Sequence, residues 1–266
     1  MLLTSSIENQ KFYLNETFIS GIQSFSLNYD TNINPSFAIS DTGLNYFVSQ
    51  PIISNFTLNY IPGDQEPFSS YTGLSFFTGK LEYSNKYLYF SSGYIENYNI
   101  SAQLDRPVEV SVQGKIYGML AYNTGLDTSS GSLNYGINPI NYCYLDLNLN
   151  EVNLDRLNSC TVNYSSKKIP KYNIGEFLPF EVIQEYPIEI NNNINFEISE
   201  DMINNPTGLF ANLNEKGIQI SFKNINNNSI IKNFTINNAI LSNKDYNFVI
   251  NDNATYSLSY KSYINN

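Results

Sequence analysis

The sequence contains no histidine and no tryptophan, and only 2 of its 266 residues are cysteine. The absence of histidine excludes Ser-His-Asp and Cys-His nucleophilic sites and removes the commonest side-chain metal ligand. Cys143 and Cys160 are too few for a structural zinc site. Because no secretion signal is apparent, we expect both to be thiols, with a disulfide as the alternative. No phosphate-binding glycine motif is present.

Charge is also scarce, since Asp, Glu, Lys and Arg make up 14% of the chain and acidic residues dominate, 24 against 14. A net charge of −10 disfavours a nucleic-acid-binding groove. No apolar run approaches the roughly 20 residues of a membrane span, so we expect no membrane anchor. Carboxylate pairs for glycoside hydrolysis cannot be recognised in a sequence, but the candidates Glu181 with Glu185 and Asp64 with Glu66 are more simply solvated surface. We therefore predict a protein without enzymatic activity, metal or cofactor.

Apolar residues are plentiful, at 42% of the chain with 15% aromatic, and they alternate with polar ones. This period of two is typical of strands with one buried face. It is clearest within GYIENYNISAQLDRPVEVSVQGKIYG (93–118), which predicts two strands joined by a tight turn, and within SNFTLNYI (54–61). The residues that we predict to be core are Phe56, Leu58, Tyr60, Val108, Val110 and Val112.

Three segments recur in the same order along the chain. They are NPSFAIS (34–40) with NINFEIS (193–199), FTLNY (56–60) with IQISF (218–222), and residues 93–117 with residues 238–264. Helical patterns are limited to Glu151–Leu157 and Ser199–Asn204. We predict an all-β fold of two tandem antiparallel β-sandwich or barrel-like modules with an intervening insert. The predicted boundaries are an N-terminal arm (1–20), a first module (21–118), an insert or linker (119–173) and a second module (174–266).

The first module resembles the tail tube proteins of long-tailed bacteriophages. The resemblance rests on the opening GIQSF (21–25), a strand that ends in a loop (54–63), and a terminal strand pair before a Tyr-Gly end (93–118). It implies a small β-sandwich that assembles into hexameric rings, which stack around a lumen for the genome. Two modules in one chain then imply a homotrimeric, pseudo-hexameric ring. The acidic balance fits a lumen through which DNA passes without specific binding.

The resemblance further implies a virion protein made in the host cytoplasm, with itself and other phage tail proteins as partners. The loop 62–73 combines prolines and glycines with aromatic residues, and we expect it, with the 1–20 arm, to contact an adjacent ring. Its candidate contact residues are Pro62, Asp64, Phe68 and Tyr71. The alternatives are a tail terminator, baseplate or neck ring protein, a carbohydrate-binding surface adhesin, and a β-sandwich of another role.

Overall fold

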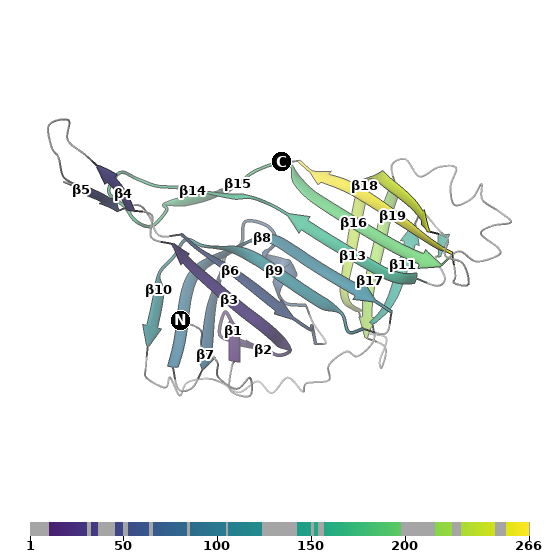
Figure 1. The fold of residues 1–266 in the computed structure, drawn as a ribbon, viewed down its shortest axis with the longest axis horizontal. Coiled ribbons are helices and arrows are strands. Elements are labelled where there is room, and N and C mark those ends of the chain that lie inside the picture. The colour runs from purple at the N-terminus through teal and green to yellow at the C-terminus, as the bar shows by residue number, and fades with distance from the viewer. Residues whose placement is uncertain are drawn as a thin grey trace.

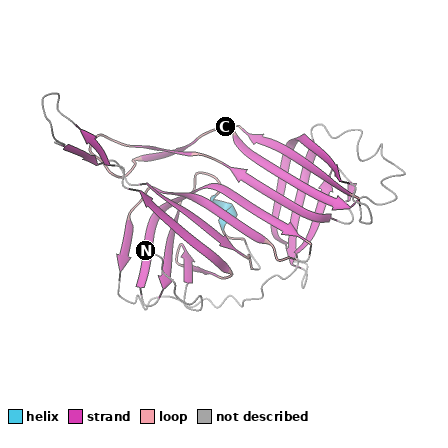
Figure 2. Ribbon diagram, in the orientation of Figure 1, coloured by secondary structure: helices cyan, strands magenta, loops and turns pink. Residues whose placement is uncertain are grey.

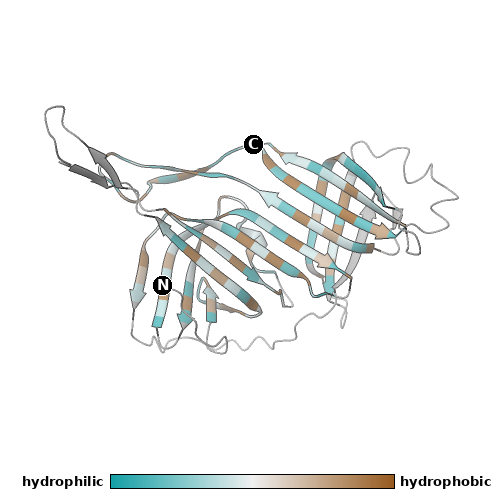
Figure 3. Cartoon of the chain, viewed as in Figure 1, coloured by the Kyte–Doolittle hydropathy of each residue, from teal (hydrophilic) through white to brown (hydrophobic). Residues whose placement is uncertain are grey.

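The computed structural model describes residues 11–30, 33–36, 46–49, 53–63, 66–83, 86–104, 106–123, 143–149, 152–153, 157–197, 216–224, 230–247 and 254–265. Over these ranges the chain forms antiparallel strands and one short 3-10 helix, η2 (Phe68–Tyr71), as Figure 2 shows. Apolar and polar residues alternate along the strands (Figure 3). The predicted all-β fold class is confirmed.

The first group of strands spans residues 11–116. Its members are β1 (Lys11–Leu14), β2 (Thr17–Ile19), β3 (Ile22–Asp30), β4 (Ile33–Ser36), β5 (Tyr46–Ser49), β6 (Ile53–Tyr60), β7 (Phe77–Tyr83), β8 (Lys86–Gln103) and β9 (Glu109–Ile116). The N-terminal half of β8 pairs with β7, which continues to β1 and β2. The C-terminal half of β8 pairs with β9, which continues to β6 and β3. A separate hairpin, β4–β5, is inserted between β3 and β6.

After β10 (Leu120–Asn123), which pairs with β8, a second group repeats this plan in the same order (Figure 1). Its members are β11 (Cys143–Leu149), β12 (Val152–Asn153), β13 (Leu157–Ser165), β14 (Lys168–Lys171), β15 (Glu181–Gln184), β16 (Ile188–Glu197), β17 (Lys216–Asn224), β18 (Ile230–Asn247) and β19 (Thr255–Ile264). In this group β18 corresponds to β8. Its N-terminal half pairs with β17, which continues to β11 and β12, and its C-terminal half pairs with β19. Next to β19 lie β16 and then β13, and β14–β15 is again a separate hairpin.

The backbone irregularities of the two groups coincide as well. The pairing of β8 with β9 shifts register between Ile95 and Asn97, and that of β18 with β19 shifts between Leu241 and Asn243. The bend before each shift has a non-glycine residue at positive φ, Ser92 (55°) in β8 and Asn238 (54°) in β18. Positive φ is uncommon outside glycine, so its recurrence at one position supports a residue-by-residue correspondence.

The start of the repeat shows the same correspondence in its sequence. Both β3 and β13 shift register against their neighbours near their first residues, at 22–24 and 157–159. Aligning these shifts sets SFSLNY (24–29) on SCTVNY (159–164), with identical Ser, Asn and Tyr. The chain thus contains one strand plan twice, and the repeats consist of β1–β9 and β11–β19.

The predicted core residues are confirmed, because Phe56, Leu58, Tyr60, Val108, Val110 and Val112 are all at most 3% exposed. Aromatic rings join the two halves of the first repeat. Phe12 of β1 lies 5.4 Å from Phe25 of β3, and Phe56 of β6 lies 5.5 Å from Phe77 of β7, between ring centroids. The strands that continue from each half of β8 therefore bury a shared aromatic core.

Three sequence interpretations differ from this structure. Residues 119–173, interpreted as an insert, contain β11–β13, which pair within the second repeat. The helical pattern at Glu151–Leu157 is wrong, because β12 and the start of β13 lie there, whereas Ser199–Asn204 lies outside the described residues. Residues 11–19 of the predicted arm form β1 and β2, because the side chains of Phe12 and Leu14 fill the core.

Candidate assembly interface

The two repeats meet edge to edge. β13 pairs antiparallel with the C-terminal half of β8 through seven residue pairs, from Ser159 opposite Gln103 to Ser165 opposite Asn97. Ile100 and Val162 lie opposite each other and are at most 1% exposed. This contact, which we call the internal joint, makes one continuous sheet in the order β3, β6, β9, β8, β13, β16, β19, β18.

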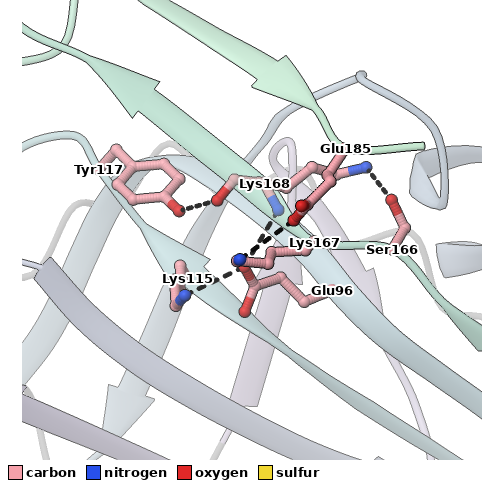
Figure 4. A network of polar contacts seen from close by, with 7 residues as sticks. All are labelled: Glu96, Lys115, Tyr117, Ser166, Lys167, Lys168 and Glu185. Carbon is pink, nitrogen blue, oxygen red and sulfur yellow. Dashed lines mark hydrogen bonds and ion pairs between the residues drawn. The ribbon is translucent and has the colours of Figure 1, made fainter. Parts of the chain in front are cut away.

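A polar cluster holds the chain where it leaves β13 and enters the β14–β15 hairpin (Figure 4). Glu96, at the register shift of β8, accepts a hydrogen bond from the backbone N–H of Lys168 at 3.2 Å and pairs with Lys115 Nζ at 3.1 Å. The hydroxyl of Tyr117 donates to the carbonyl of Lys168 at 3.0 Å. The N–H of Ser166 donates to the carbonyl of Glu96 at 2.7 Å. Side chains of the first repeat therefore fix the hairpin root of the second.

The buried amine in this cluster belongs to Lys168, which is 1% exposed. Its Nζ donates to Ser166 Oγ and to Gln184 Oε1, both at 2.8 Å. Burial lowers the pKa of Lys168 to about 8, against the raising effect of the Glu96 charge. Burial also raises the pKa of Tyr117, as does the charge of Glu96. The neighbouring Lys167 is exposed and pairs with Glu185 at 3.0 Å (Figure 4).

The sheet face opposite the core is made mostly of amides and hydroxyls, and we call it the amide face. One row of directly opposite residues crosses seven strands from β3 to β19: Ser24, Asn59, Ser111, Asn99, Asn163, Asn191 and Lys261. Each is half-buried or exposed. Asn59 Nδ2 donates to Ser24 Oγ at 2.8 Å, and Lys261 Nζ pairs with Glu189 at 3.2 Å. None of the seven residues of this row is acidic, although acidic residues outnumber basic ones in the chain.

Both ends of the continuous sheet are open within the described residues. β3 pairs with β6 alone, and residues 240–247 of β18 pair with β19 alone. β3 corresponds to β13, and β18 corresponds to β8. The two open edges are therefore formed by the strands that correspond to the two strands of the internal joint. Unpaired edges of this kind are a template for pairing with another chain.

The predicted inter-ring loop packs inside its own repeat. Phe68 is 0% exposed, Pro62 is buried, and Tyr71 is half-buried and accepts a hydrogen bond from Asn15 Nδ2 at 2.7 Å. Asp64 lies outside the described residues. Phe68 therefore has no exposed surface to offer another chain.

The reason for this burial is Glu66, which is itself only 8% exposed, so its interpretation as solvated surface is wrong. Its carboxylate accepts hydrogen bonds from the backbone N–H of Phe68 at 3.0 Å, from that of Ser69 at 2.7 Å, and from the hydroxyl of Tyr60. A carboxylate just before η2 satisfies the first donors of that helix. Burial, then the charge of Glu66, raises the pKa of both Tyr60 and Tyr98.

Exposed apolar side chains gather instead at the tip of the β14–β15 hairpin. Ile174, Phe177, Leu178 and Phe180 are each more than half exposed within YNIGEFLPF (172–180). Figure 1 shows this hairpin and β4–β5 extending to the same side of the continuous sheet. Four apolar residues in a short Gly- and Pro-containing segment are a signal in the sequence, which our interpretation treated only as the entry to a module.

No protein-family model and no curated protein matches this chain. Among the residues that the structure describes, no three acidic or cysteine side chains gather as metal ligands would, and no helix has the length and apolarity to cross a membrane.

Proposed function

We propose that this chain is a structural virion protein that forms the stacked rings of a phage tail tube, the conduit for DNA from capsid to host. The observation that carries the proposal is the repeat: within the part of the chain that the structure describes, the strands that correspond to the two sides of the internal joint have open edges at the two ends of the sheet. A surface that binds a different surface on the next copy gives either a closed ring or an open helix.

Three chains per ring are the expected number. The tail tube proteins that the first repeat resembles form rings of six modules, and this chain supplies two. Every repeat in a closed trimer would then have the same neighbours, either through the internal joint or through its intermolecular counterpart. Closure would also cover both open edges, which otherwise invite irregular aggregation.

The amide face is the proposed wall of the lumen. An acidic lumen was the expectation from composition, whereas the row across this face supports a wall made mostly of amides and hydroxyls, in which the charge of Lys261 is paired with Glu189. Amides and hydroxyls hold water by hydrogen bonds but lack the cations that bind phosphates tightly. Such a wall suits DNA that passes without specific binding.

The two hairpins are the proposed contacts between stacked rings, in place of the loop 62–73. They emerge from equivalent points of the two repeats, and the β14–β15 tip carries exposed Ile174 and Phe177. An exposed apolar cluster on a projecting element is typical of a protein–protein contact. Other tail proteins at the ends of the tube would meet the same surfaces.

Light scattering after size-exclusion chromatography and negative-stain microscopy of the purified chain test the proposal. We expect three chains per particle, ring-shaped particles, and tubes at high concentration. The variant Phe177→Ser/Leu178→Ser should form rings but fewer tubes. Rings that never stack in the wild-type protein would favour a terminator, baseplate or neck protein, and a chain that stays monomeric at high concentration would refute assembly and favour an adhesin.

A further inference from the structure

We propose that residues 240–247 of β18 pair with β3 of a second copy of this chain in the register of the internal joint. In this arrangement the hydroxyl of Tyr263 donates a hydrogen bond to the backbone of β4 in that copy. This inference rests on the proposed function and adds the partner surface, the register and one specific side chain. It follows from the correspondence between the repeats, which sets β18 on β8, β19 on β9, and β3 and β4 on β13 and β14.

Exposed fractions at corresponding positions show which surface the chain leaves uncovered. Tyr94 of the first repeat is 9% exposed, whereas its counterpart Ile240 is 49% exposed. Tyr117 is 1% exposed because it packs beneath the hairpin root, whereas its counterpart Tyr263 is 48% exposed. Tyr117, which contacts the hairpin root of the second repeat, is thus matched by an exposed tyrosine at the open end of the sheet, and Tyr94 by an exposed isoleucine.

The other open end shows the complementary difference. Cys160 and Val162 of β13 are at most 1% exposed at the internal joint. Their counterparts in β3, Phe25 and Leu27, are only partly buried, and Tyr29 at the end of the same strand is 49% exposed. The surface of β3 is therefore apolar on its core side and uncovered at its edge, as expected for a strand that receives a neighbour.

The internal joint fixes the register of the intermolecular one. Asn99 lies opposite Asn163 in the internal joint. Because Asp245 corresponds to Asn99 and Asn28 to Asn163, Asp245 of one copy should lie opposite Asn28 of the next. The hydroxyl of Tyr117 donates to the carbonyl of Lys168, so that of Tyr263 should donate to the carbonyl of Ile33 in the next copy.

The polar cluster does not recur at this second joint. Ser242 stands where the first repeat has Glu96, and Ile33 where the second has Lys168. The Glu96 carboxylate and the buried amine are therefore features of the internal joint alone. Salt should therefore act on self-association through the repulsion between copies of net charge −10, and not through this cluster.

Disulfide crosslinking of the full chain tests the register. The pair Asp245→Cys/Asn28→Cys should crosslink neighbouring copies, because directly opposite residues have Cα atoms within disulfide reach. Since the proposed ring closes after three chains, covalent trimers and no larger species are expected. The matched control Asp245→Cys/Ser24→Cys shifts one thiol by four residues, roughly 13 Å along the strand, and should not crosslink. The pair Asn99→Cys/Asn163→Cys supplies the same geometry within one chain, and single-cysteine variants reveal any reaction of Cys143.

A side-chain variant tests the contact between Tyr263 and β4 of the second copy independently. Tyr263→Ala should weaken self-association by about tenfold or more, as for a large side chain buried at a contact. Tyr89→Ala, which removes an exposed tyrosine from the doubly paired half of β8, should change it less than about twofold. Rings that crosslink only through the shifted pair would overturn the register and leave the proposed function standing. A wild-type chain that stays monomeric would overturn both.

Discussion

Replacing Lys168 by methionine should remove a pH dependence of stability that arises at the internal joint. The amine is buried among Ser166 and Gln184, and its pKa is lowered to about 8 by burial. An unfolded lysine has a pKa of about 10.4. Between these values the unfolded chain binds the extra proton, so the free energy of unfolding rises with pH.

The size of the effect follows from the two pKa values. Below pH 8 the buried charge destabilises the folded chain in full, and above about pH 10.4 this cost is gone. Integration between pH 7.5 and 9.5 gives a gain of about 2 kcal/mol in the free energy of unfolding. Lys168→Met should lack this gain and should be more stable than the wild type at pH 7 if the cavity is filled equally well.

Urea unfolding at pH 7.5, 8.5 and 9.5, at one low protein concentration, measures the dependence. The control is Lys167→Met, which removes the adjacent exposed lysine and should leave the pH dependence intact. If Lys168→Met keeps the slope of the wild type, the buried amine is not its source, and our account of the polar cluster fails.

Three further stability predictions use the same assay. Val110→Asp buries an unpaired charge and should cost about 3–5 kcal/mol, whereas Ser111→Asp, on the opposite face of β9, should cost less than about 1 kcal/mol. A Cβ atom at Gly114 would lie 1.9 Å from a carbonyl oxygen of β8, so Gly114→Ala should lower the free energy of unfolding by about 1–3 kcal/mol. Gly73→Ala is the control, because a Cβ atom there would have no atom within 4 Å, and it should be nearly neutral. Equal effects of the two variants would contradict this packing. Burial raises the pKa of Tyr260 to about 12, so stability should fall as pH rises from 10 to 12, and less steeply in Tyr260→Phe.

The strands and the core could be predicted from the sequence because their signal is local. Val108, Val110 and Val112 alternate with polar residues, and a half-buried strand requires that pattern. The correspondence between the repeats was harder to read. NINFEIS (193–199) shares Asn, Phe, Ile and Ser with NPSFAIS (34–40), yet the pairing sets β16 on β6 and leaves Asn192 where β6 has Phe56. In a chain rich in Asn and Ile, short identities arise without structural equivalence.

Whether a residue of the loop 62–73 can contact another chain depends on its exposure, which cannot be read from composition. Phe68 lies in a loop with Pro62 and Gly63, a composition that favours exposure. Glu66 reverses that expectation, because its carboxylate fixes the backbone of η2 and directs Phe68 into the core. The open edges of β3 and β18 could not be predicted either, since an edge is defined by which strands pair across long separations.

In the proposed ring, the covalent connection between the repeats would change the assembly reaction itself. When six identical modules close a ring, the equilibrium concentration of rings varies with the sixth power of the free subunit concentration. When each chain already holds two modules in place, the exponent is three, and half of the joints form during folding at the effective concentration of a tethered pair. Ring formation then begins at lower chain concentrations and offers fewer incomplete intermediates. The long strand β8, which carries the internal joint, would thus provide half of the joints of the ring before any two chains meet.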